Sequence, residues 1–79
     1  MPRSRLLFFT GPNCPACEIL KPIVQTICSA HRIKMIVIDA TEHIELAQKH
    51  NVNLLPTVCY KDFCIDGYFE DEDIEALFA

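Results

Sequence analysis

The sequence lacks long apolar runs and an excess of positive charge. None of its apolar stretches approaches the ~20 residues that a membrane-spanning helix needs, so we expect no membrane partner. Its 7 Lys and Arg against 11 Asp and Glu give a formal net charge of −4, which provides no general attraction to nucleic acid. It also lacks internal repeats and linkers, so we expect one domain over residues 1–79.

An export signal is also missing from the sequence. The basic segment from Met1 to Arg5 is similar to the start of a signal peptide, but the apolar run that follows it ends at Thr10. That run is shorter than the ~7–15 residues of a signal-peptide core. We therefore expect a cytoplasmic protein. In a reducing cytosol, 5 cysteines indicate redox chemistry or metal binding more than a disulfide framework.

What the sequence does contain is a closely spaced cysteine pair, Cys14 and Cys17. An apolar run at 6–9 precedes the pair, and a segment with helical periodicity follows it. The unpaired N–H groups and the positive end of a helix favour a thiolate, which is the reactive form of cysteine. Pro15 suits the first helical position. We expect the pair to change between dithiol and disulfide with little backbone movement.

The apolar pattern predicts an α/β fold with the element order βαβαββα. Continuous apolar runs predict buried strands at 5–10 and 34–39. The remaining expected elements are a helix from about Pro15 to Ala30, a helix from about Thr41 or Glu42 to His50 with Thr41 as its N-cap, a hairpin of 57–60 and 63–65, and a helix from about Glu70 to Phe78. The first strand–helix–strand unit implies parallel pairing. We therefore expect a four-stranded mixed sheet with helices on both faces.

With this arrangement, the chain resembles the thioredoxin and glutaredoxin superfamily over essentially its whole length. Cys14-Pro15-Ala16-Cys17 matches the redox motif of that superfamily, between the first strand and the first long helix. Pro22 matches its helix-kinking proline, and the segment that ends in Leu55-Pro56-Thr57 looks like the one that carries its cis-proline. The resemblance implies a thioredoxin-like fold of glutaredoxin size, with a cis peptide bond between Leu55 and Pro56.

The sequence departs from both branches of the superfamily near the expected site. Asn13 stands where thioredoxins usually have a tryptophan, and Phe8 stands where they have a buried aspartate. The proton relay attributed to that aspartate is therefore absent or supplied by another group. Leu54-Leu55-Pro56 replaces the Thr-Val-Pro of the glutaredoxin glutathione site, and Phe69 replaces the aspartate that would meet the glutathione amine. These departures favour a thioredoxin-like reductase over a glutaredoxin.

We interpret the chain as a dithiol–disulfide oxidoreductase that acts on protein disulfides, with Cys14 as nucleophile and Cys17 as resolving cysteine. The expected substrate contacts are Asn13, Pro15, Leu55 and Pro56, and the resemblance implies that the Leu55 backbone pairs with a substrate strand. We expect no cofactor and no metal, because a thiolate is both nucleophile and leaving group. A reductase or glutathione is expected to supply electrons to a monomeric protein.

The other cysteines leave alternatives open. Cys59 and Cys64 are expected to lie opposite each other across the hairpin. We interpret both as ordinary reduced thiols, and Cys28 as a packing residue, with a second disulfide between Cys59 and Cys64 as the alternative. For the whole chain, the alternatives are a glutathione-dependent glutaredoxin and a non-catalytic metal-binding module that uses Cys14, Cys17, Cys59 and Cys64.

Overall fold

The computed structural model describes residues 4–79. The first three residues of the basic segment compared above with a signal peptide lie outside this range. The elements are β1 (Arg5–Thr10), α1 (Pro15–Ala30), β2 (Lys34–Asp39), α2 (Ile44–Lys49), β3 (Thr57–Tyr60), β4 (Phe63–Asp66) and α3 (Asp71–Leu77). The predicted element order is confirmed, and the bounds of the first three elements agree with the prediction.

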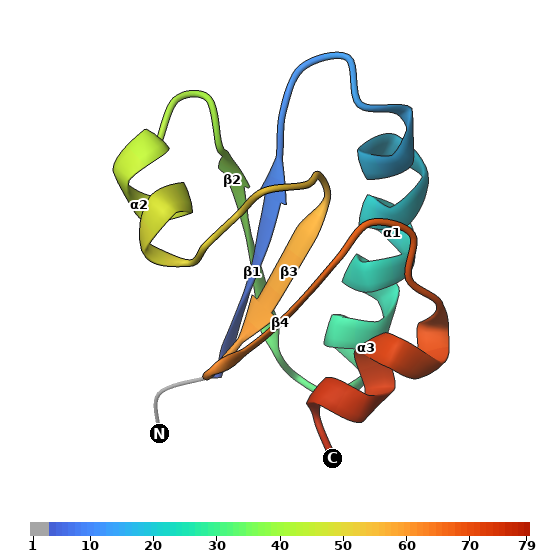
Figure 1. Cartoon of the computed structure of the whole chain (residues 1–79). Coiled ribbons are helices and arrows are strands. Elements are labelled where there is room, and N and C mark those ends of the chain that lie inside the picture. Colours follow the sequence, from blue (N-terminus) through green and yellow to red (C-terminus); the bar gives the residue numbers. More distant parts are fainter. Residues whose placement is uncertain (1–3) are drawn as a thin grey trace.

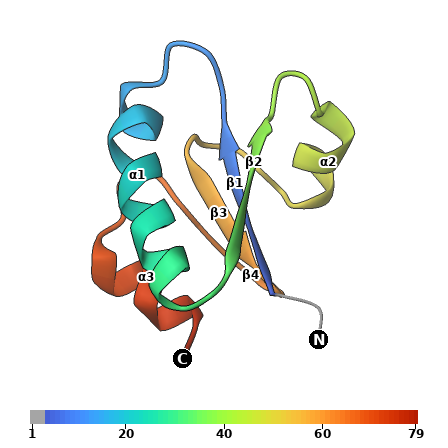
Figure 2. The ribbon, with the colours of Figure 1, turned by 180° about the vertical axis from the view of Figure 1, so that it is seen from behind.

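The four strands form one mixed sheet in the order β2-β1-β3-β4. β1 is parallel to β2 and antiparallel to β3, and β3 is antiparallel to β4. Helix α2 covers one face of the sheet, while α1 and α3 cover the other (Figure 1). The view from behind shows the same two layers of helices (Figure 2). The predicted α/β fold, a four-stranded mixed sheet with helices on both faces, is confirmed.

The centre of the sheet explains why the first apolar run is continuous. Phe8 and Phe9 both have 0% of their surface exposed, although neighbouring side chains of a strand point to opposite faces. Phe8 packs in a cluster with Leu20 and Val24 of α1. Phe9 packs in a second cluster with Ala47 of α2. A strand with helices over both faces needs apolar residues at successive positions, and β1 has them at residues 6–9.

Helix α2 is shorter than predicted, and the assignment of Thr41 as its N-cap was wrong. Both the backbone N–H and the hydroxyl of Thr41 donate hydrogen bonds to Oδ1 of Asp39, at 2.8 and 2.5 Å. These bonds hold the pKa of Asp39 below its ordinary value, and the bond from the hydroxyl contributes most. They close a turn after β2, so the helix begins at Ile44 and His43 occupies the N-cap.

Helix α3 is one residue shorter at each end than the sequence pattern predicted. Glu70 is its N-cap and Phe78 its C-cap. The Glu70 backbone N–H donates a hydrogen bond of 2.8 Å to Oδ2 of Asp73, which fixes the start of the helix. Asp71, Glu72 and Asp73 lie in the first turn of α3, where negative charge stabilises a helix.

Candidate functional site

The structure joins Cys14 and Cys17 in a disulfide at the start of α1, with their Cα atoms 5.3 Å apart. Cys14 is the N-cap residue, and its sulfur accepts a hydrogen bond of 3.2 Å from the backbone N–H of Cys17. Cys14 is half-buried, whereas Cys17 is only 3% exposed. Of the two sulfur-bearing residues, Cys14 is therefore the one that solvent and other molecules can approach.

The loop before α1 presents this pair at the upper end of the sheet in Figure 1. Asn13 has a φ of 55°, a left-handed conformation that asparagine tolerates better than most residues. Pro15 occupies the first turn of α1, where its missing N–H costs no hydrogen bond. Both residues are exposed and flank Cys14. A shallow depression beside the pair is lined by residues 10–14 together with Cys17, Glu18 and Lys21.

The peptide bond between Leu55 and Pro56 is cis, as the resemblance implied. A Cβ atom on Gly11 would lie 2.7 Å from Cδ1 of Leu55, so the side chain of Leu55 rests directly on the loop that carries the cysteines. The Pro56 carbonyl accepts a hydrogen bond of 3.1 Å from the backbone N–H of Gly67, which ties this segment to the end of β4. The structure thus places the loop that ends at Cys14, the first turn of α1 and the Leu55–Pro56 segment, which together carry the six predicted site residues, at one end of the sheet.

The surroundings of Cys17 are apolar. Its side chain belongs to the core cluster that also contains Phe8, Leu20 and Val24. Phe8 stands at the position where thioredoxins usually have a buried aspartate, and it is 0% exposed. This cluster therefore surrounds Cys17 with hydrophobic packing, and among residues 4–79 the buried polar or charged side chain is Thr57.

Cys59 and Cys64 form a second disulfide, so the interpretation of both as reduced thiols was wrong. They are paired residues of β3 and β4, and their Cα atoms are 4.1 Å apart. Residues that lie directly opposite each other on antiparallel strands have closely spaced Cα atoms, and this short distance brings the two sulfurs into bonding range. Cys59 is buried, whereas Cys64 is exposed.

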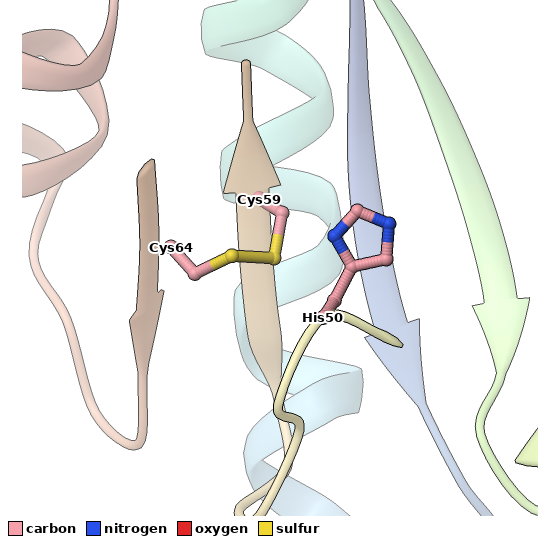
Figure 3. A group of neighbouring side chains, drawn as sticks. All are labelled: His50, Cys59 and Cys64. Atoms are coloured by element: carbon pink, nitrogen blue, oxygen red, sulfur yellow. A yellow bond between two sulfur atoms is a disulfide. The ribbon is translucent and has the colours of Figure 1, made fainter. Parts of the chain in front are cut away.

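The structure does not bring the four cysteines of the metal-module alternative together. Cys17 packs with Phe8 on the α1 face of the sheet, whereas Cys59 packs with Phe9 on the α2 face. Within residues 4–79, the group of side chains able to hold a metal ion is instead His50, Cys59 and Cys64 (Figure 3). Sequence reasoning missed His50, because no spacing pattern connects it to the cysteines.

The remaining cysteine, Cys28, is a buried free thiol in α1. It is 0% exposed and belongs to the cluster beneath α1, which confirms the interpretation as a packing residue. Burial raises the pKa of its thiol to about 11. Cys28 is therefore protonated and unreactive near neutral pH.

The Thioredoxin family model matches residues 2–75. The chain belongs to the thioredoxin family. This thioredoxin-family chain is 41% identical over 51 residues to methylamine utilization protein MauD of Methylobacillus flagellatus, covering 61% of this chain and 25% of that protein. It is 34% identical over 74 residues to protein disulfide isomerase-like 1-4 of Oryza sativa subsp. japonica, covering 87% of this chain and 13% of that protein. The chain thus spans a quarter or less of the length of these relatives.

Solved thioredoxins share its fold. Thioredoxin 1 from Thermosipho africanus TCF52B superimposes with a TM-score of 0.80 at 24% identity, covering 94% of this chain and 89% of the other. Mitochondrial thioredoxin 3 from Saccharomyces cerevisiae superimposes with a TM-score of 0.74 at 16% identity, covering 96% and 76%. Among residues 4–79, no helix combines the length and apolarity needed to cross a membrane. Family membership and the Cys14–Cys17 disulfide together support a thiol–disulfide redox centre.

Proposed function

We propose that this chain is a thiol–disulfide oxidoreductase that reduces or exchanges protein disulfides through Cys14 and Cys17. The observation that carries the proposal is the unequal placement of two bonded cysteines at one helix start. Cys14 is half-buried at the N-cap, and Cys17 is 3% exposed. An approachable sulfur next to a protected one suits a nucleophile and a resolving cysteine.

The reaction begins from the dithiol form. The Cys14 thiolate attacks one sulfur of the substrate disulfide, forming a mixed disulfide and releasing the other substrate sulfur as a thiolate. Cys17 then gives up its proton, which the released substrate thiolate or solvent takes, attacks the Cys14 sulfur and releases the second substrate thiolate, which leaves the Cys14–Cys17 disulfide. Two electrons pass from the protein to the substrate. The N–H of Cys17, which lies 3.2 Å from the Cys14 sulfur, stabilises negative charge on Cys14.

The substrate binds across the two loops at this end of the sheet. Asn13 and Pro15 form the exposed rim beside Cys14, and Leu55 lies against the same loop through its contact at Gly11. An extended substrate segment pairs with the backbone of Leu55 in the manner of an added strand, next to Pro56. The chain acts as a monomer, and it needs no cofactor, because thiolates alone carry the exchange.

A reductase or glutathione returns the pair to the dithiol form. The buried position of Phe69 supports the thioredoxin-like alternative over a glutathione-dependent glutaredoxin. Phe69 is 7% exposed and packs in the core cluster, so it offers no polar group to the glutathione amine. The cytoplasmic location stays a prediction.

Two measurements test this function. The reduction potential of the Cys14–Cys17 pair, obtained by equilibration with glutathione buffers and trapping of free thiols, is expected between about −270 and −180 mV, the values of thioredoxin and protein disulfide isomerase. Reduction of insulin disulfides with dithiothreitol as reductant is expected to be accelerated by the chain. A pair that resists both oxidation and exchange would refute the proposal.

A further inference from the structure

A second group of reactive side chains lies on the other face of the sheet from the Cys17 cluster. The donor atoms of His50, Cys59 and Cys64 all lie within 4.8 Å of one another. Figure 3 shows the His50 imidazole beside the Cys59–Cys64 disulfide, with one ring nitrogen facing Cys59. A cross-strand disulfide by itself does not need an imidazole at this place, so the position of the ring calls for another explanation.

The backbone and packing around His50 hold the ring there. His50 is the C-cap of α2, and its backbone N–H donates a hydrogen bond of 3.2 Å to the Leu46 carbonyl. Asn51 follows in a left-handed conformation with φ of 55°, and the Val52 N–H bonds to the Ala47 carbonyl at 2.9 Å. This hydrogen-bonded turn fixes the direction in which the chain leaves the helix.

The His50 ring also lies against Phe9 of β1, with 5.6 Å between the ring centroids. Phe9 is 0% exposed at the centre of the sheet, so this wall of the site is rigid. The sulfurs are fixed from the other side by the pairing of β3 with β4. Three donors from two separate parts of the fold are therefore preorganised at one place.

We propose that His50, Cys59 and Cys64 bind a zinc ion when the Cys59–Cys64 disulfide is reduced. Two thiolates and one imidazole are ligands that zinc prefers, and zinc sites with three protein ligands keep a fourth position for water. Cys59 is buried, His50 half-buried and Cys64 exposed, so the ion lies at the surface with its fourth position toward solvent.

The disulfide and the zinc-bound state of this site exclude each other, because each of them uses both sulfurs. A dithiol reductant transfers two electrons and two protons to the disulfide, which gives the Cys59 and Cys64 thiols and an oxidised reductant. Zinc then displaces the two thiol protons and binds both thiolates with neutral His50. Oxidation of the sulfurs by a small disulfide such as oxidised glutathione releases the ion. The site thus couples metal binding to thiol redox state.

This inference does not depend on the proposed function of Cys14 and Cys17. It is therefore tested in the full chain carrying Cys14→Ser and Cys17→Ser, so that the first pair cannot bind metal. After reduction, the protein is titrated with zinc ions against a chromophoric chelator. We expect about one bound ion per chain, and we expect His50→Ala or Cys64→Ser to weaken binding by about tenfold or more, the loss seen even for outer partners of metal ligands.

His43→Ala is the matched control, because His43 lies at the opposite end of the same helix, is exposed and makes no capping hydrogen bond with its side chain. It should bind zinc as tightly as its parent. Equal binding by the His50→Ala and His43→Ala variants, or no binding by the parent, would overturn the proposal.

A second measurement does without the Cys14→Ser and Cys17→Ser substitutions. In the reduced natural chain, zinc should protect Cys59 and Cys64 from alkylation, with each modified cysteine identified by peptide mass spectrometry. The ratio of the alkylation rate without zinc to the rate with zinc should fall in His50→Ala but not in His43→Ala. Unprotected Cys59 and Cys64 in a folded, zinc-saturated protein would equally refute the site, whatever happens at Cys14 and Cys17.

Discussion

The two disulfides of this chain are built from opposite kinds of structure. Cys14 and Cys17 are neighbours on one helical turn, and their Cα atoms are 5.3 Å apart. Cys59 and Cys64 face each other from two strands, with Cα atoms 4.1 Å apart. The first pair is next to a helix N-terminus, and the second is next to an imidazole.

This difference separates the chemistry of the two pairs. At the first pair, the Cys17 N–H donates to the Cys14 sulfur at a helix N-terminus, a place that favours a thiolate, and Cys14 lines a depression in the surface. At the second pair, the strands hold both sulfurs beside His50, a third donor for a soft metal ion. We therefore expect catalytic exchange from the first pair only, and we expect stability and metal binding from the second.

The sharpest test of this comparison removes the proposed nucleophile, Cys14. Cys14→Ser should lower the rate of insulin reduction by about a thousandfold or more, because loss of the nucleophile in covalent catalysis costs several orders of magnitude. Cys17→Ser should instead accumulate a mixed disulfide between Cys14 and the substrate, detectable by mass spectrometry. Cys28→Ala is the control, since it removes a cysteine outside both pairs and should keep the activity. If Cys14→Ser reduced insulin as fast as the unchanged chain, Cys14 would not be the nucleophile.

The unpaired thiol of Cys28 gives the next largest effect. Because burial raises its pKa from 9.0 to about 11, the thiolate fraction near neutral pH falls by about a hundredfold. Alkylation of the oxidised, folded protein by iodoacetamide should be slower than that of an exposed thiol by at least this factor, and it should accelerate as the pH rises toward 11. Mass spectrometry of the alkylated protein, sampled over time, measures the rate.

The same shift has a consequence for stability. Between pH 9.0 and about 11, the folded thiol keeps a proton that the unfolded thiol loses, so this group lowers the free energy of unfolding as the pH rises. Cys28→Ala should remove this contribution to the pH dependence of the free energy of unfolding.

The alkylation experiment also has an outcome that would contradict the structure. If iodoacetamide modifies one cysteine only after denaturation, the other four are bonded, whereas rapid modification of the native protein at pH 7 would contradict the burial of Cys28.

The sequence was most informative where local pattern decides structure. The continuous apolar run of β1 and the helical spacing of α1 gave correct bounds, since both depend on which faces are buried. The Cys14–Cys17 pair was predicted from its spacing at the start of a helix, whereas the cis bond at Leu55–Pro56 was implied by the family resemblance. The start of α2 did not follow, because Asp39 takes up the hydrogen-bond donors of Thr41.

The second site was predicted only in part. Placing Cys59 opposite Cys64 required no more than the turn at 61–62, and the structure has that register. His50 reaches the pair only through the packing of α2 on the sheet, which sequence spacing does not encode. The second disulfide also weakens the basis of the cytoplasmic prediction, because stable disulfides are typical of oxidising compartments.

A change at the second pair should affect stability. Cys64→Ser breaks the disulfide at an exposed position and keeps the buried Cys59 in place. In the oxidised protein with a chelator present, it should lower the free energy of unfolding by about 2 kcal/mol, the value for a closed loop of about six residues. Urea denaturation measures the loss. The difference should disappear when both proteins are reduced, and a difference that persists would place its cause outside the disulfide.

The smallest effect tests whether the Leu55 loop belongs to the first pair. In Gly11→Ala, the new Cβ would meet Cδ1 of Leu55 at 2.7 Å, so the Leu55 side chain must move. We expect a stability loss of about 1 kcal/mol from overpacking and a rise of about fivefold in the KM for a protein disulfide. Gly67→Ala is the control for stability: with φ of 74° and no atom within 4 Å of the new Cβ, it should cost about 1 kcal/mol by backbone strain, and the backbone N–H that bonds to the Pro56 carbonyl is kept. Because Gly67→Ala leaves the Leu55 contact intact, only Gly11→Ala should change KM, and an equal rise in both would mean that KM reports stability rather than substrate binding.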